Sequence, residues 1–207
     1  MRARICFGSL LAVLSATFFN TGASAQEERF LIGIEAGIFE PLGFADADDA
    51  VYGDSLVPLG VRLEWAMAPR FALALSGTWM STDGEQVAVL PGEGVVPTGV
   101  GTALDLASFH LTAAWRIHPE GPWSGYLGAG PTWAKLEESS EFEESSESRV
   151  GGHVAGGIRR SFGGFTLGAE ALYAVVPDLV GEGGAAAAFG EDDGGGLAAT
   201  LLLGYAF

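Results

Sequence analysis

The feature that most constrains this chain is a two-residue alternation of apolar and polar residues that recurs along most of its length. In the clearest segment, 57–67, every odd position is apolar, whereas Arg62 and Glu64 lie among the even positions. Side chains of a β-strand point alternately to its two faces. The pattern therefore predicts strands with one apolar face and one small or polar face.

Eight segments carry this pattern: 30–39, 57–67, 71–80, 105–117, 123–135, 149–162, 165–175 and 197–207. Each is near the roughly 9–11 residues that a tilted strand needs to cross a bilayer. No run of about 18 uninterrupted apolar residues follows residue 25, which argues against a membrane-spanning helix. A closed barrel also satisfies all backbone hydrogen bonds within a membrane. The sequence thus predicts an all-β fold, an eight-stranded antiparallel up-and-down transmembrane β-barrel.

The connections between these segments alternate strictly between short and long. The short ones are 68–70, 118–122 and 163–164, and the long ones are 40–56, 81–104, 136–148 and 176–196. Outer-membrane barrels have short periplasmic turns and longer extracellular loops. Both termini are therefore expected to face the periplasm.

Aromatic residues gather near both ends of the predicted strands, as in the interfacial girdles of membrane barrels. The alternative is a soluble eight-stranded barrel of the lipocalin type, which would bury its apolar face inside. Here one face carries charges in the middle of the strands, and the other is apolar and ends in aromatics. This distribution favours the membrane barrel.

Residues 1–25 have the three parts of a secretory signal peptide. Arg2 and Arg4 precede an apolar stretch, 10–19, and Ala23-Ser24-Ala25 is a small-residue cleavage site. The expected division is a signal peptide, 1–25, and an outer-membrane barrel domain, 26–207, exported to the bacterial outer membrane. Cys6 lies in the leader, so the mature chain is expected to contain no disulfide.

The chain is strongly acidic, with a formal net charge of −16 that becomes −18 when the two leader arginines are removed. Such a charge makes nucleic acid a poor partner. The four long connections contain 19 acidic residues and no lysine or arginine, and the serine-rich run 137–148 is expected to be mobile. The favoured interpretation is a solvated acidic surface. Carboxylates also suit divalent cations, so Asp46, Asp48 and Asp49 form a weak candidate cluster, although no twelve-residue calcium loop is present. No cofactor is expected.

The polar face of the strands carries eight titratable residues that we expect to line the lumen: Glu35, Arg62, Glu64, His110, Arg116, His153, Arg159 and Glu170. Charges inside a membrane barrel are expected to pair with one another. One hypothesis is a salt-bridged plug that fills a narrow lumen. The other is a gate, in which an arginine exchanges glutamate partners to open a small pore.

Two local features carry a resemblance to the small outer-membrane barrel superfamily that includes OmpA, OmpX, OmpW and opacity-type proteins. One is the glycine-rich segment 125–131, GYLGAGP, and the other is the terminal LLLGYAF, 201–207. Tyr205 and Phe207 resemble the alternating, aromatic-ended signal that the barrel-assembly machinery reads, although Leu202 stands where that signal usually has glycine. The resemblance implies a Gram-negative cell-envelope protein whose partners are outer-membrane lipid, lipopolysaccharide and the assembly machinery.

Fold alone does not establish the function of such a barrel. The first hypothesis is a non-enzymatic protein with a structural or surface-interaction role through acidic extracellular loops. The second is a narrow, porin-like channel for small solutes of the OmpW sort. The third, a lipid A-modifying enzyme, is least favoured, because Ser108 and His110 share a face that parity assigns to the lumen, and no catalytic residue is proposed.

Overall fold

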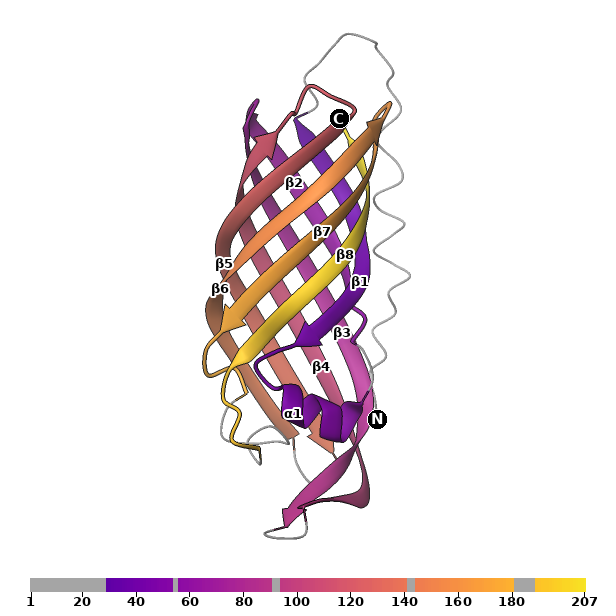
Figure 1. Ribbon diagram of the computed structural model, residues 1–207, viewed down its shortest axis with the longest axis vertical. Coiled ribbons are helices and arrows are strands. Elements are labelled where there is room, and N and C mark those ends of the chain that lie inside the picture. The colour runs from indigo at the N-terminus through magenta and orange to yellow at the C-terminus, as the bar shows by residue number, and fades with distance from the viewer. Residues whose placement is uncertain (1–28, 54–55, 91–93, 141–143, 181–188) are drawn as a thin grey trace.

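Eight antiparallel strands form a closed barrel in the computed structural model (Figure 1). The structure describes residues 29–53, 56–90, 94–140, 144–180 and 189–207, so the expected signal peptide lies outside the described residues. The strands are β1 (Phe30–Pro41), β2 (Leu59–Ala68), β3 (Phe71–Leu90), β4 (Gly94–Ile117), β5 (Trp123–Ser140), β6 (Glu144–Phe162), β7 (Phe165–Val176) and β8 (Gly194–Ala206).

Each strand pairs with the next, and β8 returns to β1 in a continuous ladder from Leu31↔Ala206 to Pro41↔Gly196. The predicted eight-stranded up-and-down barrel is therefore confirmed. Within the ring, this closure leaves no unpaired edge among the described strands. Among the described residues, no helix is long and apolar enough to span a membrane.

The apolar face of every strand lies on the outside of the barrel. Leu201, for example, is 69% exposed, whereas Arg62, which faces the inside, is 1% exposed. Aromatic pairs occur at both strand ends, including Phe71–Trp115 near the short turns and Phe109–Trp133 near the long connections, with ring centroids 4.6 and 5.5 Å apart. An apolar exterior with a polar interior excludes the soluble alternative and fits a membrane barrel.

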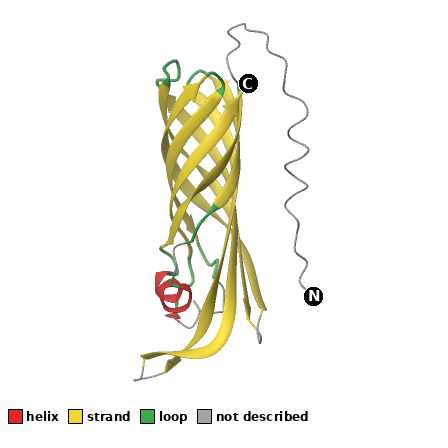
Figure 2. Cartoon of the chain, turned by 90° about the vertical axis from the view of Figure 1, so that its right-hand side faces the viewer, coloured by secondary structure: helices red, strands yellow, loops and turns green. Residues whose placement is uncertain are grey.

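Two of the predicted long loops are instead continuations of the barrel strands. β3 and β4 stay paired to Leu90↔Gly94, with one irregularity between Glu85 and Val87, and β5 and β6 stay paired to Ser139↔Glu144. Figure 2 shows these hairpins projecting beyond the barrel. The prediction of loops at 81–104 and 136–148 was wrong because strands outside the membrane need no apolar face, so the alternation disappears while the backbone pairing continues.

The expectation of a mobile run at 137–148 is also wrong for its described residues, because they belong to β5 and β6 and only 141–143 lie outside the description. The described parts of the other two long connections pack against the barrel. The first contains a short helix, α1 (Ala45–Ala47), which continues into one π-helical segment, η2 (Asp48–Tyr52). Figure 1 shows this helical segment at the end of the barrel opposite the C-terminus.

The orientation of the barrel can be tested with single cysteines, because Cys6 is the only natural one and belongs to the expected signal peptide. We predict that Ser139→Cys, on the β5–β6 hairpin, reacts with an impermeant maleimide on intact cells. Glu120→Cys, in a short turn, should react only after the outer membrane is disrupted. Labelling of Glu120→Cys on intact cells would contradict the expected orientation.

Candidate functional site in the barrel lumen

The centre of the lumen is occupied by a layer of ion pairs, here called the Arg–Glu layer, which consists of Glu35, Arg62, Glu64, Arg159 and Glu170. Arg62 Nη1 donates to Glu170 Oε2 at 2.6 Å and to Glu35 Oε1 at 3.3 Å. Arg62 Nε lies 3.6 Å from Glu64 Oε2, and Arg159 Nη1 donates to the same oxygen at 2.7 Å. The five side chains are between 2% and 8% exposed.

The Arg–Glu layer crosses the whole width of the lumen. Glu64 lies on β2 and Arg159 on β6, which are four strands apart in a ring of eight and so face each other across the diameter. Arg62, on β2, likewise reaches Glu170 on β7. Eight strands enclose an interior just wide enough for side chains to fill. A direct ion pair across that width therefore leaves no open path through the layer.

Tyr126 is a member of this layer that was not among the predicted lumen residues. Its hydroxyl donates to Glu170, and its ring centroid lies 4.3 Å from Arg159 Cζ and 5.3 Å from Arg62 Cζ. A side chain at Gly157 would collide with this ring, since a Cβ there would lie 2.6 Å from Tyr126 Cε1. Strand parity could have identified Tyr126, because its neighbour Leu127 faces outward and Tyr126 must then face the lumen.

The two predicted lumen histidines form a separate layer with threonine rather than joining the charges. His110 Nδ1 and Thr132 Oγ1 are 2.9 Å apart, and Thr132 Oγ1 and His153 Nδ1 are also 2.9 Å apart. His153 Nε2 reaches Thr112 Oγ1 at 2.9 Å, and the two imidazole rings pack edge to face at 5.1 Å. These hydrogen bonds satisfy buried polar groups that would otherwise be costly in the lumen.

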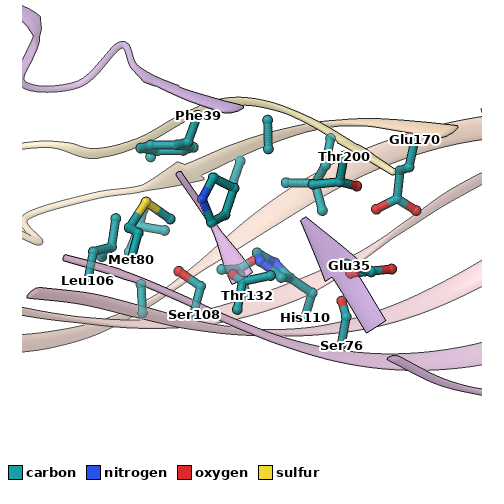
Figure 3. A pocket seen from close by; sticks show the side chains of 18 of the residues that line it. Glu35, Phe39, Ser76, Met80, Leu106, Ser108, His110, Thr132, Glu170 and Thr200 are labelled. Carbon is teal, nitrogen blue, oxygen red and sulfur yellow. The ribbon is translucent and has the colours of Figure 1, made fainter. Parts of the chain in front are cut away.

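A small cavity lies on each side of the Arg–Glu layer. One, of about 40 Å³, is lined by Glu35, Glu170, His110, Ser108 and Met80 among others (Figure 3). The other, of about 50 Å³, lies nearer the short turns. Glu64, Arg159 and Arg116 line this second cavity, so the structure places Arg116 beside the layer. Each cavity has room for only a few water-sized molecules.

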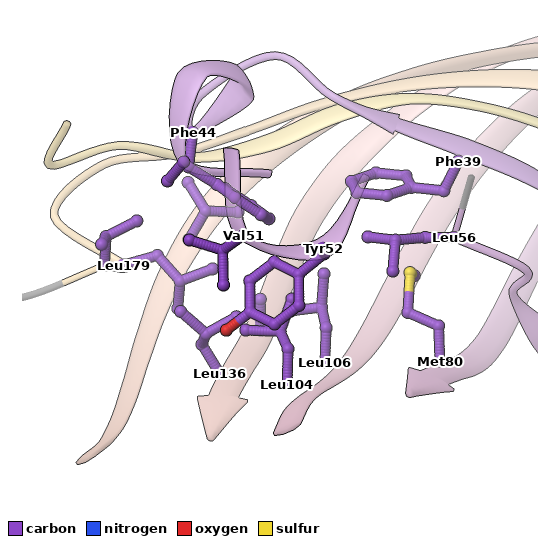
Figure 4. Close-up of a cluster of buried hydrophobic side chains, with 14 residues drawn as sticks. Phe39, Phe44, Val51, Tyr52, Leu56, Met80, Leu104, Leu106, Leu136 and Leu179 are labelled. Atoms are coloured by element: carbon purple, nitrogen blue, oxygen red, sulfur yellow. The ribbon is translucent and has the colours of Figure 1, made fainter. Parts of the chain in front are cut away.

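The mouth of the lumen at the end opposite the short turns is filled by an apolar lid, residues 44–53, that the sequence pattern did not predict. Figure 4 shows Phe44, Val51 and Tyr52 of this lid facing side chains of the barrel wall. The buried cluster comprises Phe39, Phe44, Ala47, Val51, Tyr52, Leu56, Met80, Leu104, Leu106, Ala134, Leu136, Val176, Leu179 and Val180. Burial of this apolar surface holds the lid in the mouth.

The carboxylate of Glu191, in the last long connection, holds the lid by hydrogen bonds. The backbone N–H groups of Asp46 and Ala47 donate to Glu191 Oε1 and Oε2 at 3.1 and 3.0 Å. These groups stand at the first turn of the helical segment, where N–H donors lack helical partners. Gly53, with φ of +63°, ends the segment in the left-handed conformation that glycine adopts readily.

The acidic cluster of Asp46, Asp48 and Asp49 is only partly on the surface. Asp46 and Asp49 are exposed. Asp48, which also belongs to the lid, is only 8% exposed, so the expectation of a solvated surface is wrong at this residue. Burial, with Asp49 and Glu40 nearby, raises the pKa of Asp48 from 3.8 to about 6. The electrostatic cost of docking the lid therefore grows as the pH rises from about 4 to 6 and is fully present above that range.

The described residues contain no group of three or more histidine, cysteine, aspartate or glutamate side chains arranged to hold a metal ion. Ser108 lines the lumen cavity together with His110, as parity predicted. Tyr205 and Phe207 lie at the short-turn end, where Tyr205 packs on Phe165 and Phe207 stacks on Phe30, with ring centroids 5.3 and 6.0 Å apart. The role of these two aromatics in assembly stays a prediction.

Comparisons with protein-family models and with curated proteins find no match. Solved structures do match. Ail of Yersinia pestis, in complex with the heparin analogue sucrose octasulfate, has a TM-score of 0.51 at 16% identity over 86% of this chain and 97% of Ail. The fold is that of the small outer-membrane barrels.

Two further structures support this assignment of the fold. Neisserial surface protein A aligns over 84% of this chain and 94% of its own, with a TM-score of 0.53 and 12% identity. The outer membrane protein OprG from Pseudomonas aeruginosa aligns over 87% and 96%, with a TM-score of 0.54 and 12% identity. The shared fold and the apolar exterior together fit a barrel that is embedded in a membrane, as the sequence pattern predicted.

The energetic weight of the Arg–Glu layer can be measured with Arg62→Ala, which leaves Glu35 and Glu170 buried without their cation. Removing one member of a buried pair typically costs about 3–5 kcal/mol. We predict a lower urea midpoint for the refolded barrel, and a smaller loss when Glu170→Gln is combined with Arg62→Ala.

The matched control is Arg149→Ala, which breaks an exposed ion pair with Glu147 of 2.9 Å. Exposed pairs contribute about 0–1 kcal/mol, so its midpoint should hardly change. Equal midpoints for Arg62→Ala and the wild type would show that Arg62 is hydrated rather than held in a closed layer.

Proposed function

We propose that this chain is a non-enzymatic outer-membrane protein with a surface-interaction role, in which acidic extracellular hairpins bind a cationic partner. The single observation that carries the proposal is that the β3–β4 and β5–β6 hairpins stay strand-paired where they project beyond the barrel mouth (Figure 2). Paired strands present their side chains at fixed spacing, which a mobile loop would not do.

The charge on these hairpins supports a cationic partner. Asp83, Glu85, Glu137 and Glu144 are exposed. The two cations on the same hairpins, Lys135 and Arg149, pair locally with Glu137 and Glu147 at 2.6 and 2.9 Å. A surface with one dominant sign attracts partners of the opposite sign. Ail was solved with a polysulfated ligand, whereas these acidic hairpins would repel such a molecule.

A binding assay tests the proposal directly. The refolded protein should bind a fluorescent oligolysine peptide, and the affinity should fall as salt rises because exposed charges are screened. The variant D83N/E85Q/E137Q/E144Q should bind at least about tenfold more weakly, whereas Glu120→Gln, in a short turn, should bind like the wild type. Binding that depends on neither salt nor these four carboxylates would contradict the proposal.

The second candidate, a narrow solute channel, rests on the two cavities that lie on either side of the Arg–Glu layer. An exchange of partners by Arg62 or Arg159 would have to join them, and the lid would have to leave the mouth. The contacts of Arg62 with three glutamates and the apolar packing of the lid both oppose this change. A lumen closed by both the Arg–Glu layer and the lid therefore favours the surface-interaction role over the channel.

A further inference from the structure

One cation breaks the apolar pattern of the barrel exterior. Arg160 is an exposed, outward-facing cation of β6 whose cross-strand partner is Trp123, an aromatic near the short turns, and the outward-facing positions on either side of it, Ile158 and Phe162, are apolar. It lies two residues before the end of β6, near the short turns. An arginine on the lipid-facing surface is costly near the bilayer midplane and costs little near the interface. Its position near the interface makes Arg160 tolerable but does not explain its presence.

The guanidinium of Arg160 is held between two aromatic rings. Arg160 Cζ lies 5.2 Å from the ring centroid of Trp123 and 4.7 Å from that of Phe162. Trp123 is its cross-strand neighbour on β5, and Leu167 is its neighbour on β7. Within the described part of the chain, Arg160 makes no side-chain hydrogen bond or ion pair. Contacts with ring faces fix the guanidinium but leave its N–H groups available for an anion.

An apolar hollow adjoins this cation on its membrane side. The hollow, of about 340 Å³, is lined by Trp123, Ile158, Phe162, Leu167 and Ala169 together with Arg160. Ile158 and Ala169 are paired across β6 and β7, two positions farther from the short turns than Arg160 and Leu167. The small side chain of Ala169 leaves space that a larger outward residue would fill. Sites for small molecules have volumes of roughly 300–1,000 Å³.

We propose that this hollow binds one phospholipid of the periplasmic leaflet. Arg160 would donate hydrogen bonds to the phosphate group, and Trp123 and Phe162 would flank the glycerol region. One acyl chain would lie in the hollow toward Ile158 and Ala169. The assignment of a phospholipid depends on how the groups are arranged along the membrane normal. The cation lies at the interface, and the apolar hollow extends from it into the bilayer. Charge complementarity selects a lipid with a phosphate over a purely apolar occupant.

The orientation of the barrel selects phospholipid over lipopolysaccharide. The hollow lies at the short-turn end, which the alternation of connections assigns to the periplasm. The periplasmic leaflet of the outer membrane consists of phospholipid. This site lies at the opposite end of the barrel from the acidic hairpins, so its test is independent of the proposed function.

Native mass spectrometry of the refolded protein can count bound lipid. With phosphatidylglycerol added in detergent, we expect one lipid to be retained by the wild type. Arg160→Gln removes the guanidinium that would bind the phosphate. Ala169→Phe keeps that charge but fills the hollow. Each should lower lipid retention at least about tenfold. Arg149→Gln, an exposed arginine outside the membrane belt, should retain lipid like the wild type. The shift in gel migration between unheated and heated samples checks that every variant is folded.

Four outcomes would overturn the proposal. Equal retention by Arg160→Gln and the wild type would show that lipid binds elsewhere. Loss with Arg160→Gln but not with Ala169→Phe would show that the cation binds a phosphate without use of the hollow, as free inorganic phosphate would do. Preferential retention of lipopolysaccharide over phosphatidylglycerol, or a dimer that Arg160→Gln abolishes, would assign the surface to a different occupant.

Discussion

The ladder between β1 and β8 is the constraint on which the rest of this structure depends. Within lipid, a backbone N–H or C=O group has no water to bond, so the strands must close on themselves. The eleven paired positions from Leu31↔Ala206 to Pro41↔Gly196 complete that ring. Closure with eight strands then sets a narrow interior, and the width of that interior determines which side chains can meet inside it.

The narrow interior explains why charge is concentrated in one layer. Arg62 and Arg159 share Glu64 and together contact three glutamates, so the desolvated charges compensate one another across the lumen. Tyr126 packs against both arginines and fills the space that Gly157 leaves open. Between this layer and the lid-covered mouth lie the His–Thr hydrogen bonds and a small cavity, and the apolar lid fills the mouth itself.

Parity along the strands made much of this site predictable. A two-residue period assigns each side chain to the inside or the outside, so the sequence alone is enough to place Glu35, Arg62, Glu64, Arg159 and Glu170 in the lumen. Parity does not show, however, how far along the barrel axis each side chain lies. Which residues meet depends on the stagger between strands, so the pairing of Glu64 with Arg159 across the diameter and the separation of the histidines from the charges could not be derived.

The lid and the extended hairpins were unpredictable for a different reason. The apolar residues of the lid, such as Phe44 and Val51, lie in or beside a short helical segment stabilised by packing and by the hydrogen bonds to Glu191 rather than by a repeating pattern. The hairpins beyond the membrane continue the pairing that the barrel has begun, even where serine and glutamate dominate. In both cases contacts distant in sequence determine a structure that local sequence does not indicate.

Planar-bilayer recording tests the central claim, that the Arg–Glu layer closes the lumen, most directly. The wild type and a variant in which a short glycine–serine linker replaces the lid, residues 44–53, should both show no stepwise ion current, because the layer remains intact in each. Current should appear when Arg62→Ala and Arg159→Ala are added to the lidless barrel. Stepwise currents through the wild type would contradict the account and identify the lumen as an open channel.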